Sequence, residues 1–231
     1  KKSRCQIEYM YKIISGKEVK HGLYKEVKDI FEPWKGKEIL VTEINYSFGK
    51  KEGAFEEYYL KLETNKKFPV IQSNYKNDLL EGEEKKFIYQ YLRSDRFEYY
   101  LSLKATFKNG KPHGLTESYN HKGKRTSSTI YENGIRNGIS IEYNFGDLIF
   151  KKFYYINDIL LKIEYFDKIG GVHSSIEYKN DKPFEGVEFS NRNNINGFYD
   201  KITYKNGKII KIESNFNFYG ESVQEDRKSV V

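Results

Sequence analysis

The stretch that decides the fold reads Phe107-Lys-Asn-Gly110-Lys-Pro-His-Gly114, and it recurs as Tyr131-Glu-Asn-Gly134-Ile-Arg-Asn-Gly138. Each copy holds an aromatic residue, an Asn-Gly pair and a second glycine. Further copies start at Tyr178 and Tyr204, and Tyr155 fills the gap, so the aromatic residues stand 24, 24, 23 and 26 residues apart. A fixed period in the twenties indicates a repeat architecture.

Each copy predicts two strands. Asn-Gly between alternating stretches is the strongest short signal of a β-hairpin, because both residues accept the positive φ angles of a type I′ turn. Residues 103–107 and 115–119 alternate in this way around Asn109-Gly110, and the next connection, near Gly123, reverses the chain again. Successive hairpins without a helical period between them predict an antiparallel meander.

Composition points to the same fold class. The chain has 21 Tyr and 16 Phe among 231 residues, and aromatic residues favour strands. The predicted fold is therefore all-β: an elongated, single-layer antiparallel array of β-hairpins with about 23–26 residues per repeat. Residues 1–220 are expected to form one repeat domain, with the clearest repeats at 103–210 and degenerate ones at 8–100. Residues 221–231 are expected to be a polar tail, and residues 29–37, 62–69 and 91–97 irregular loops.

Alternation along the strands predicts which side chains share the apolar face of the sheet. The expected sets are Leu103, Ala105 and Phe107; Ile139, Ile141 and Tyr143; Ile163 and Tyr165; Ile176 and Tyr178; Val187 and Phe189; and Ile202 and Tyr204. The residues between them are mostly polar. This pattern is typical of an antiparallel sheet with one face in water.

Two groups of residues are candidates for a structural or a binding role. The glycines expected at repeat turns are Gly110, Gly114, Gly134, Gly138, Gly186 and Gly207. Tyr99, Tyr100 and Tyr154 stand in runs of rings, so some of these rings must face away from the core and could form an interaction surface. The alternative is that they stack across strands and stiffen the sheet.

The residue patterns of catalysis are not found. His21 and His113 precede repeat glycines and are expected to be exposed turn residues, while His121 and His173 stand apart from them. One cysteine, Cys5, offers neither zinc spacing nor a nucleophile with a histidine at a recognisable distance. We therefore expect no enzymatic activity, no cofactor and no metal site.

The charge pattern bears on partners. The net charge of +7 is the difference between 40 basic and 33 acidic residues, and lysines alternate with glutamates instead of forming a basic stripe. Nucleic-acid binding is therefore not expected. No run of about 18 apolar residues predicts a membrane-spanning helix. The sequence starts at Lys1 and not at Met, which is compatible with a trimmed chain or with a removed export signal.

At the quoted residues the chain resembles the MORN repeat family, in its bacterial variant with a Tyr-x-Asn-Gly-Lys-x-x-Gly core, over about residues 46–210. The resemblance implies a β-hairpin array that serves binding or assembly. Some relatives are described as antitoxin-like or immunity components and others as exported surface proteins, and the eukaryotic repeats were linked to membranes and scaffolding. The chain departs from the pattern at Asp158 and Asp181, which replace turn glycines, and lacks the glycine expected near residue 162. Irregular units are expected there.

Together these observations predict a non-enzymatic module for protein–protein recognition, either immunity/antitoxin-like or an exported cell-surface protein. Exposed sheet edges and tyrosine-rich faces would bind the protein partner. The alternative is a membrane- or envelope-associated scaffold whose scattered lysines contact anionic lipid. Lipid binding through lysines would weaken steeply with salt, whereas tyrosine-centred recognition would not.

Overall fold

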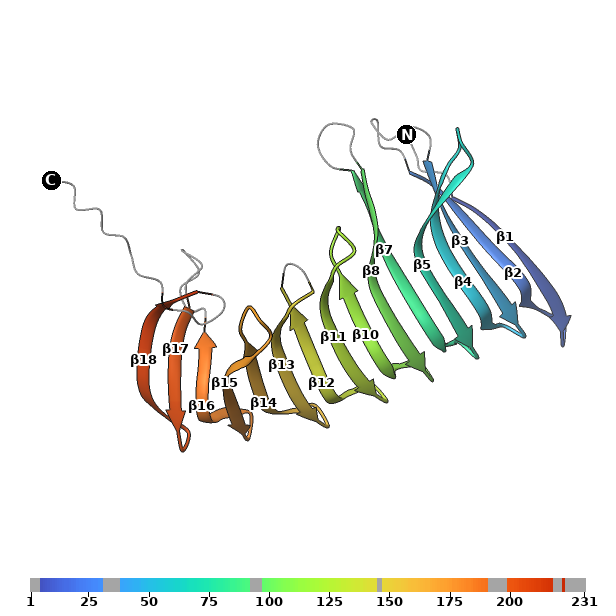
Figure 1. Ribbon diagram of the computed structural model, residues 1–231. Helices are drawn as coiled ribbons and strands as arrows, with labels where there is room; N and C mark the ends of the chain where they lie inside the picture. Colours follow the sequence, from blue (N-terminus) through green and yellow to red (C-terminus); the bar gives the residue numbers. More distant parts are fainter. Residues whose placement is uncertain are drawn as a thin grey trace. The chain divides into compact units, whose positions relative to one another are not determined.

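The computed structural model describes residues 5–30, 38–91, 97–144, 147–190, 199–217 and 222. All regular secondary structure in these residues is β, arranged as eighteen strands in one open antiparallel meander (Figure 1). The predicted all-β hairpin array is confirmed. The predicted loops at 29–37 and 91–97 and the predicted tail lie largely outside the described residues.

The chain divides into two compact units. Unit 1 comprises residues 1–125 and 131–134, and unit 2 comprises residues 126–130 and 135–231. The extent of a single repeat domain over 1–220 stays a prediction.

Unit 1 holds ten complete strands among its described residues. They are β1 (Cys5–Ile14), β2 (Lys17–Ile30), β3 (Glu38–Ser47), β4 (Lys50–Lys61), β5 (Lys66–Lys76), β6 (Leu79–Leu80), β7 (Gly82–Tyr91), β8 (Phe97–Lys108), β9 (Lys111–Pro112) and β10 (Gly114–Tyr119). Residues of β11 (Arg125–Glu132) belong to both units. The strands of unit 2 are β12 (Ile135–Tyr143), β13 (Ile149–Ile156), β14 (Ile159–Phe166), β15 (Val172–Lys179), β16 (Lys182–Ser190), β17 (Tyr199–Lys205) and β18 (Lys208–Phe216).

Two-residue turns with positive φ at both positions close the repeats. Asn109 and Gly110 have φ of 51° and 76°, the values of a type I′ turn. The same geometry recurs where aspartate replaces glycine, because Asp158 and Asp181 adopt φ of 65° and 57°. Irregular units are expected here from the sequence, but the turns themselves are regular at both aspartates. A short polar side chain tolerates the left-handed conformation well enough to keep the hairpin.

The second glycine of the motif pairs with the next repeat. We call the aromatic residue two positions before each turn the anchor. Five glycines lie directly opposite the anchor of the following repeat: Gly22 with Tyr46, Gly53 with Tyr75, Gly82 with Phe107, Gly138 with Tyr155 and Gly186 with Tyr204. A ring beside a glycine covers backbone that has no side chain of its own, a known way to stabilise glycine in a sheet.

The pairing of Gly138 shows that part of the prediction of which side chains share the apolar face is wrong. Because Gly138 lies opposite Tyr155, the polar Ser140 falls opposite Phe153, on the face that carries the anchors. Ile139 pairs instead with Tyr154, on the other face. The prediction that residues 139 and 141 share the anchor face is therefore wrong.

The same correction applies to Val187. Gly186 opposite Tyr204 places Glu188 opposite Ile202 on the anchor face, and Val187 pairs with Thr203 on the other face. In β12 and β16, the pairing of the glycine with the next anchor decides which side chains face the core, and the order of apolar residues along the strand does not.

The turns also bond to the preceding repeat. The backbone N–H of the second turn residue donates to a carbonyl of the repeat before it. The pairs are Gly49 to Lys20 (2.8 Å), Asp78 to Lys51 (3.0 Å), Gly110 to Leu80 (2.8 Å), Gly134 to Pro112 (2.7 Å), Asp158 to Arg136 (2.9 Å) and Gly207 to Phe184 (2.8 Å). These bonds extend the ladder into the turns, so consecutive turns are held in register.

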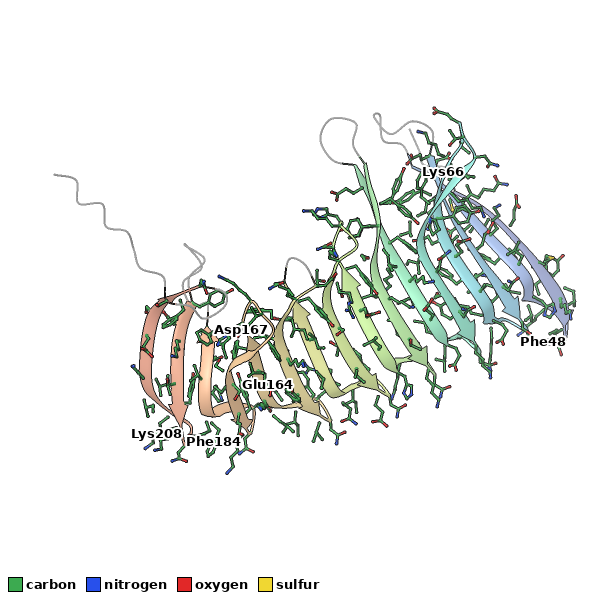
Figure 2. The ribbon with its side chains drawn as sticks, viewed as in Figure 1. Phe48, Lys66, Glu164, Asp167, Phe184 and Lys208 are labelled. Carbon is green, nitrogen blue, oxygen red and sulfur yellow. The ribbon has the colours of Figure 1, made fainter. Side chains whose placement is uncertain are left out.

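The connections at the opposite ends of the strands differ from these turns. Asn120 Oδ1 accepts from the N–H groups of Lys122 (2.9 Å) and Lys124 (3.1 Å). Asp167 Oδ1 accepts in the same way from Ile169 (3.0 Å) and Gly171 (2.7 Å). In Figure 2, Asp167 and Lys208 label the two opposite strand ends of unit 2. Lys66 and Phe48 label the two opposite strand ends of unit 1. Each unit therefore has a turn end, with the type I′ turns, and a loop end.

The predicted loop at residues 62–69 is wrong. Residues 62–65 form a tight turn, and β5 begins at Lys66. Pro69 pairs with Tyr58 at a register shift between β4 and β5. A bulge is one of the few places where a sheet accepts proline.

The buried side chains of each unit belong to strands of the sheet and pack against one another on it. In unit 2 the buried cluster is Ile163, Tyr165, Ile176, Phe189, Ile202 and Tyr204. Burial of each such side chain contributes roughly 1.5–3 kcal/mol. In unit 1, Val41, Ile44, Tyr58, Phe68 and Ala105 are buried.

Replacing Gly186 tests the close approach of β15 and β16 at this glycine. A Cβ at this residue, whose φ is 116°, would meet the carbonyl oxygen of Ser175 and lie 3.0 Å from the Cα of Ile176. Gly186→Ala should therefore lower the free energy of unfolding by at least about 3 kcal/mol. Gly207→Ala is the control, because its Cβ would lie 3.8 Å from the nearest atom, a Phe184 ring carbon. It should cost about 1–2 kcal/mol, from φ strain alone. Equal losses in urea denaturation would contradict this close approach of β15 and β16.

Candidate interaction surfaces

Strand β1 is an edge strand that is exposed along its whole length. All ten of its residues are exposed, and among the described strands it pairs with β2 alone. Six large apolar side chains are between 39% and 63% exposed: Ile7, Tyr9, Met10, Tyr11, Ile13 and Ile14. The backbone N–H and C=O groups that face away from β2 are open to another strand.

Strand β18 differs from β1 although it also carries exposed isoleucines. Its Phe216 forms a bridge with Ser222. Two of its three charged side chains are paired with each other, since Lys211 Nζ lies 2.9 Å from Glu213 Oε1. Of these two strands, β1 is therefore the more accessible to pairing with another strand. The sequence signal for it is a run of apolar residues at both odd and even positions, Tyr9 to Ile14.

Tyr99, a predicted surface residue, packs inside unit 1. Its ring stacks on Phe87 at 5.6 Å and lies 5.6 Å from Phe68. Tyr89 joins these rings and donates its hydroxyl to Glu38 Oε1 at 2.7 Å. Burial raises the pKa of Tyr99. The ring is half-buried among its neighbours.

Tyr100 and Tyr154 make different contacts. The Tyr100 ring lies 6.4 Å from that of His121, edge to face. In unit 2 the Tyr154 hydroxyl donates to Glu164 Oε2 at 2.6 Å, and Lys162 Nζ lies 2.8 Å from the other oxygen of that carboxylate. These partners place Tyr154 on the polar face of its strands. The three predicted surface tyrosines form no common patch within either unit, because Tyr154 belongs to unit 2 and the other two to unit 1.

The residue before the second glycine supports the neighbouring turn. Glu81 Oε2 accepts from the N–H of Asn109 at 2.9 Å, and Glu185 Oε2 accepts from that of Asn206 at 3.1 Å. His113 Nδ1 takes the same place under Asn133, at 3.4 Å. The sequence motif did not predict this role for the residue before the glycine. Its signal is an acceptor, Glu, His or Asn, directly before the glycine in most copies of the motif.

All six glycines predicted at repeat turns have positive φ. The values are 76° at Gly110, 96° at Gly114, 89° at Gly134, 118° at Gly138, 116° at Gly186 and 74° at Gly207.

Cationic side chains lie over rings or beside carboxylates. Lys20 Nζ is 4.3 Å from the centre of the Tyr24 ring and 5.0 Å from that of Tyr46. Such contacts contribute about 0.5–1 kcal/mol at exposed sites. Lys104 Nζ lies 2.8 Å from a Glu83 oxygen. Some of the lysine ammonium groups are therefore already in contact with rings or carboxylates of the same chain.

A polar cluster lies on the anchor face of unit 2. The Tyr204 hydroxyl donates to Glu188 Oε2 at 3.2 Å. Burial lowers the pKa of Lys151, and the carboxylates of Glu142 and Glu188 oppose this shift. Burial raises the pKa of Tyr165. The acidic and basic groups thus offset one another within the sheet.

A hollow of about 330 Å³ lies between β4, β5 and β7 in unit 1. Its polar lining is bonded within itself, since Gln72 Nε2 donates to Glu56 Oε1 (2.9 Å) and Lys85 Nζ lies 2.9 Å from a Glu83 oxygen. The buried Ser73 Oγ has no hydrogen-bond partner in the structure. The hollow offers polar contacts but no nucleophile paired with a base.

Comparison of the chain with protein-family models and with curated proteins found no match. Among the described residues, no three His, Cys, Asp or Glu side chains gather as metal ligands would. Nor does any helix in the described ranges have the length and apolar character to cross a membrane.

The turn support of Glu81 is measurable. Glu81→Ala removes the acceptor under Asn109 and should lower the free energy of unfolding by about 1 kcal/mol. Glu81→Gln keeps an acceptor oxygen and should lose less. The control is Glu63→Ala, in the exposed turn between β4 and β5. A loss at residue 63 equal to that at residue 81, in urea titrations, would contradict the role.

The Tyr154–Glu164 bond predicts a loss of stability in alkali. The bond to Glu164 is the largest of the effects that raise the pKa of Tyr154 to about 12, from an ordinary value of about 10. The stability that Tyr154 contributes is therefore complete below pH 10 and is lost as the pH rises to about 12. Wild type should accordingly lose its advantage over Tyr154→Phe across this window, in denaturation at a series of pH values. Glu164→Gln should flatten the same loss, and an advantage that does not change with pH would disprove the assignment.

Proposed function

We propose that this chain is a non-enzymatic repeat module for protein–protein recognition, and that β1 is its recognition edge. The observation that carries the proposal is the exposure of all ten β1 residues, six of them large and apolar. Scattered exposed apolar residues are normal on proteins, but a contiguous strand of them is typical of an interaction site.

The chemistry of an edge strand supports this function. An added strand gains main-chain hydrogen bonds along the open edge, and alternate side chains give specificity. Natural edges that avoid partners are short, contain proline or carry inward charges. β1 is ten residues long, has no proline, and carries only two charged residues, Glu8 and Lys12.

Tyrosine suits β1 to a protein partner. Tyr9 and Tyr11 combine an apolar ring with a polar hydroxyl, the composition enriched at protein interfaces. Their rings lie 6.2 Å apart on neighbouring positions of one face.

The repeat motif supports a family proposal. We assign the repeats to the bacterial variant of the MORN family on the anchor, turn and second-glycine motif, and binding or assembly is the role that this resemblance implies. An immunity/antitoxin-like role and a surface role both fit such a module.

A photo-crosslinker at Ile7 tests recognition at β1. Placed there, it should yield adducts with a polypeptide, and Ile13→Lys should abolish them by guarding the edge. The matched control is Ile210→Lys, on β18, because Ile13 and Ile210 are similarly exposed, at 63% and 60%. A crosslinker at Ile169, which is 94% exposed, reports random encounters.

Adducts of equal yield at Ile7 and Ile169 would contradict recognition at β1. Vesicles of phosphatidylserine and phosphatidylcholine provide the second arm. Binding to them that vanishes with added salt, together with lipid adducts at Ile7, would favour the lipid scaffold instead.

A further inference from the structure

We infer that the β1 edge binds β1 of a second copy of this chain, antiparallel and centred on Met10. The inference rests on the proposed function, since it names the partner of the same edge. Pairing about a two-fold axis at Met10 joins residues whose numbers add up to 20.

The two charges of β1 select this register. Glu8 and Lys12 are the charged residues of the strand, and they stand symmetrically about Met10. In this register Glu8 lies opposite Lys12 of the second copy, and Lys12 lies opposite its Glu8. Centring the pair on residue 8 or on residue 12 would instead place like charges directly opposite, which is destabilising.

The apolar residues match in the same register. Ile7 lies opposite Ile13 of the second copy, and Tyr9 lies opposite its Tyr11. All four are exposed in the single chain. Aliphatic and aromatic cross-strand pairs each add to stability, so one register satisfies charge and apolar contact together.

Both charged groups are available for the pairing. Glu8 Oε1 accepts from Gln6 Nε2 at 2.7 Å, and Lys12 Nζ lies 5.1 Å from the centre of the Phe48 ring. Neither is ion-paired with another described residue. An opposite charge on a second copy therefore displaces no ion pair within the described chain.

Strand β18 lacks this self-complementarity. The register that places Lys211 opposite Glu213 would set Ile209 against Asn215 and Lys208 against Phe216. Its Lys211 and Glu213 are already paired with each other, at 2.9 Å. Pairing of β1 with itself closes after two chains, whereas β1 on β18 of the next copy would continue into open assemblies.

A charge exchange tests the register. Glu8→Lys sets lysine against Lys12 of the second copy, and Lys12→Glu sets glutamate against its Glu8. Each variant alone should weaken dimerisation at least about tenfold, because two attractive pairs become repulsive. An equimolar mixture of the two variants should restore dimers, since every charged pair is then opposite in sign. The double variant should dimerise like wild type.

Sedimentation equilibrium over a concentration series gives the masses, and circular dichroism confirms that each variant is folded. Lys208→Glu, on β18, changes the net charge as Lys12→Glu does and should leave the dimer unchanged. Dimers that persist in both single variants, a mixture that stays monomeric, or masses that rise beyond two chains would each overturn the inference.

The outcome separates this inference from the proposed function. A monomeric wild type whose Ile7 crosslinker still captures a different polypeptide, in a manner abolished by Ile13→Lys, overturns self-pairing and leaves recognition at β1 standing. Absence of both dimers and β1-specific adducts overturns both.

Discussion

The pairing of an aromatic anchor with the glycine of the preceding repeat is the contact on which the sheet depends. It sets the register, because Gly186 opposite Tyr204 decides which side chains of β16 and β17 share a face. At Gly186 itself the backbone of β15, in the same hairpin, lies so close that no side chain fits. The bonds between consecutive turns and the acceptors such as Glu81 then hold the next turn in place.

What the sequence predicts well is what depends on neighbouring residues in the chain. The turn at Asn109 and Gly110 follows from two residues that accept positive φ, and eight such turns define a meander. The face of Ile139 and the role of Glu81 depend on the neighbouring repeat, so alternation within one strand could not reveal them. The predicted loop at residues 62–69 is wrong for a similar reason, since the bulge that accommodates Pro69 exists only once β4 and β5 are paired.

The candidate surface was less predictable than the fold. Runs of tyrosine drew attention to Tyr99, which packs against Phe87 and Phe68 in its own unit. The exposure of β1 depends on its place at the edge of the sheet. In the sequence, the only sign of this place is that apolar residues stand at both odd and even positions of the strand. An open meander leaves two outer strands. In this chain β1 and β18 differ in length and in charge, and Phe216 of β18 forms a bridge with Ser222.

The anchor–glycine contact also limits how such a gene can change in length. Because the contact joins one repeat to the next, the smallest segment that can be duplicated or deleted without leaving a bare glycine runs from one anchor to the following one. Insertions of other sizes are tolerated only at the loop ends, where no ring has to meet a partner.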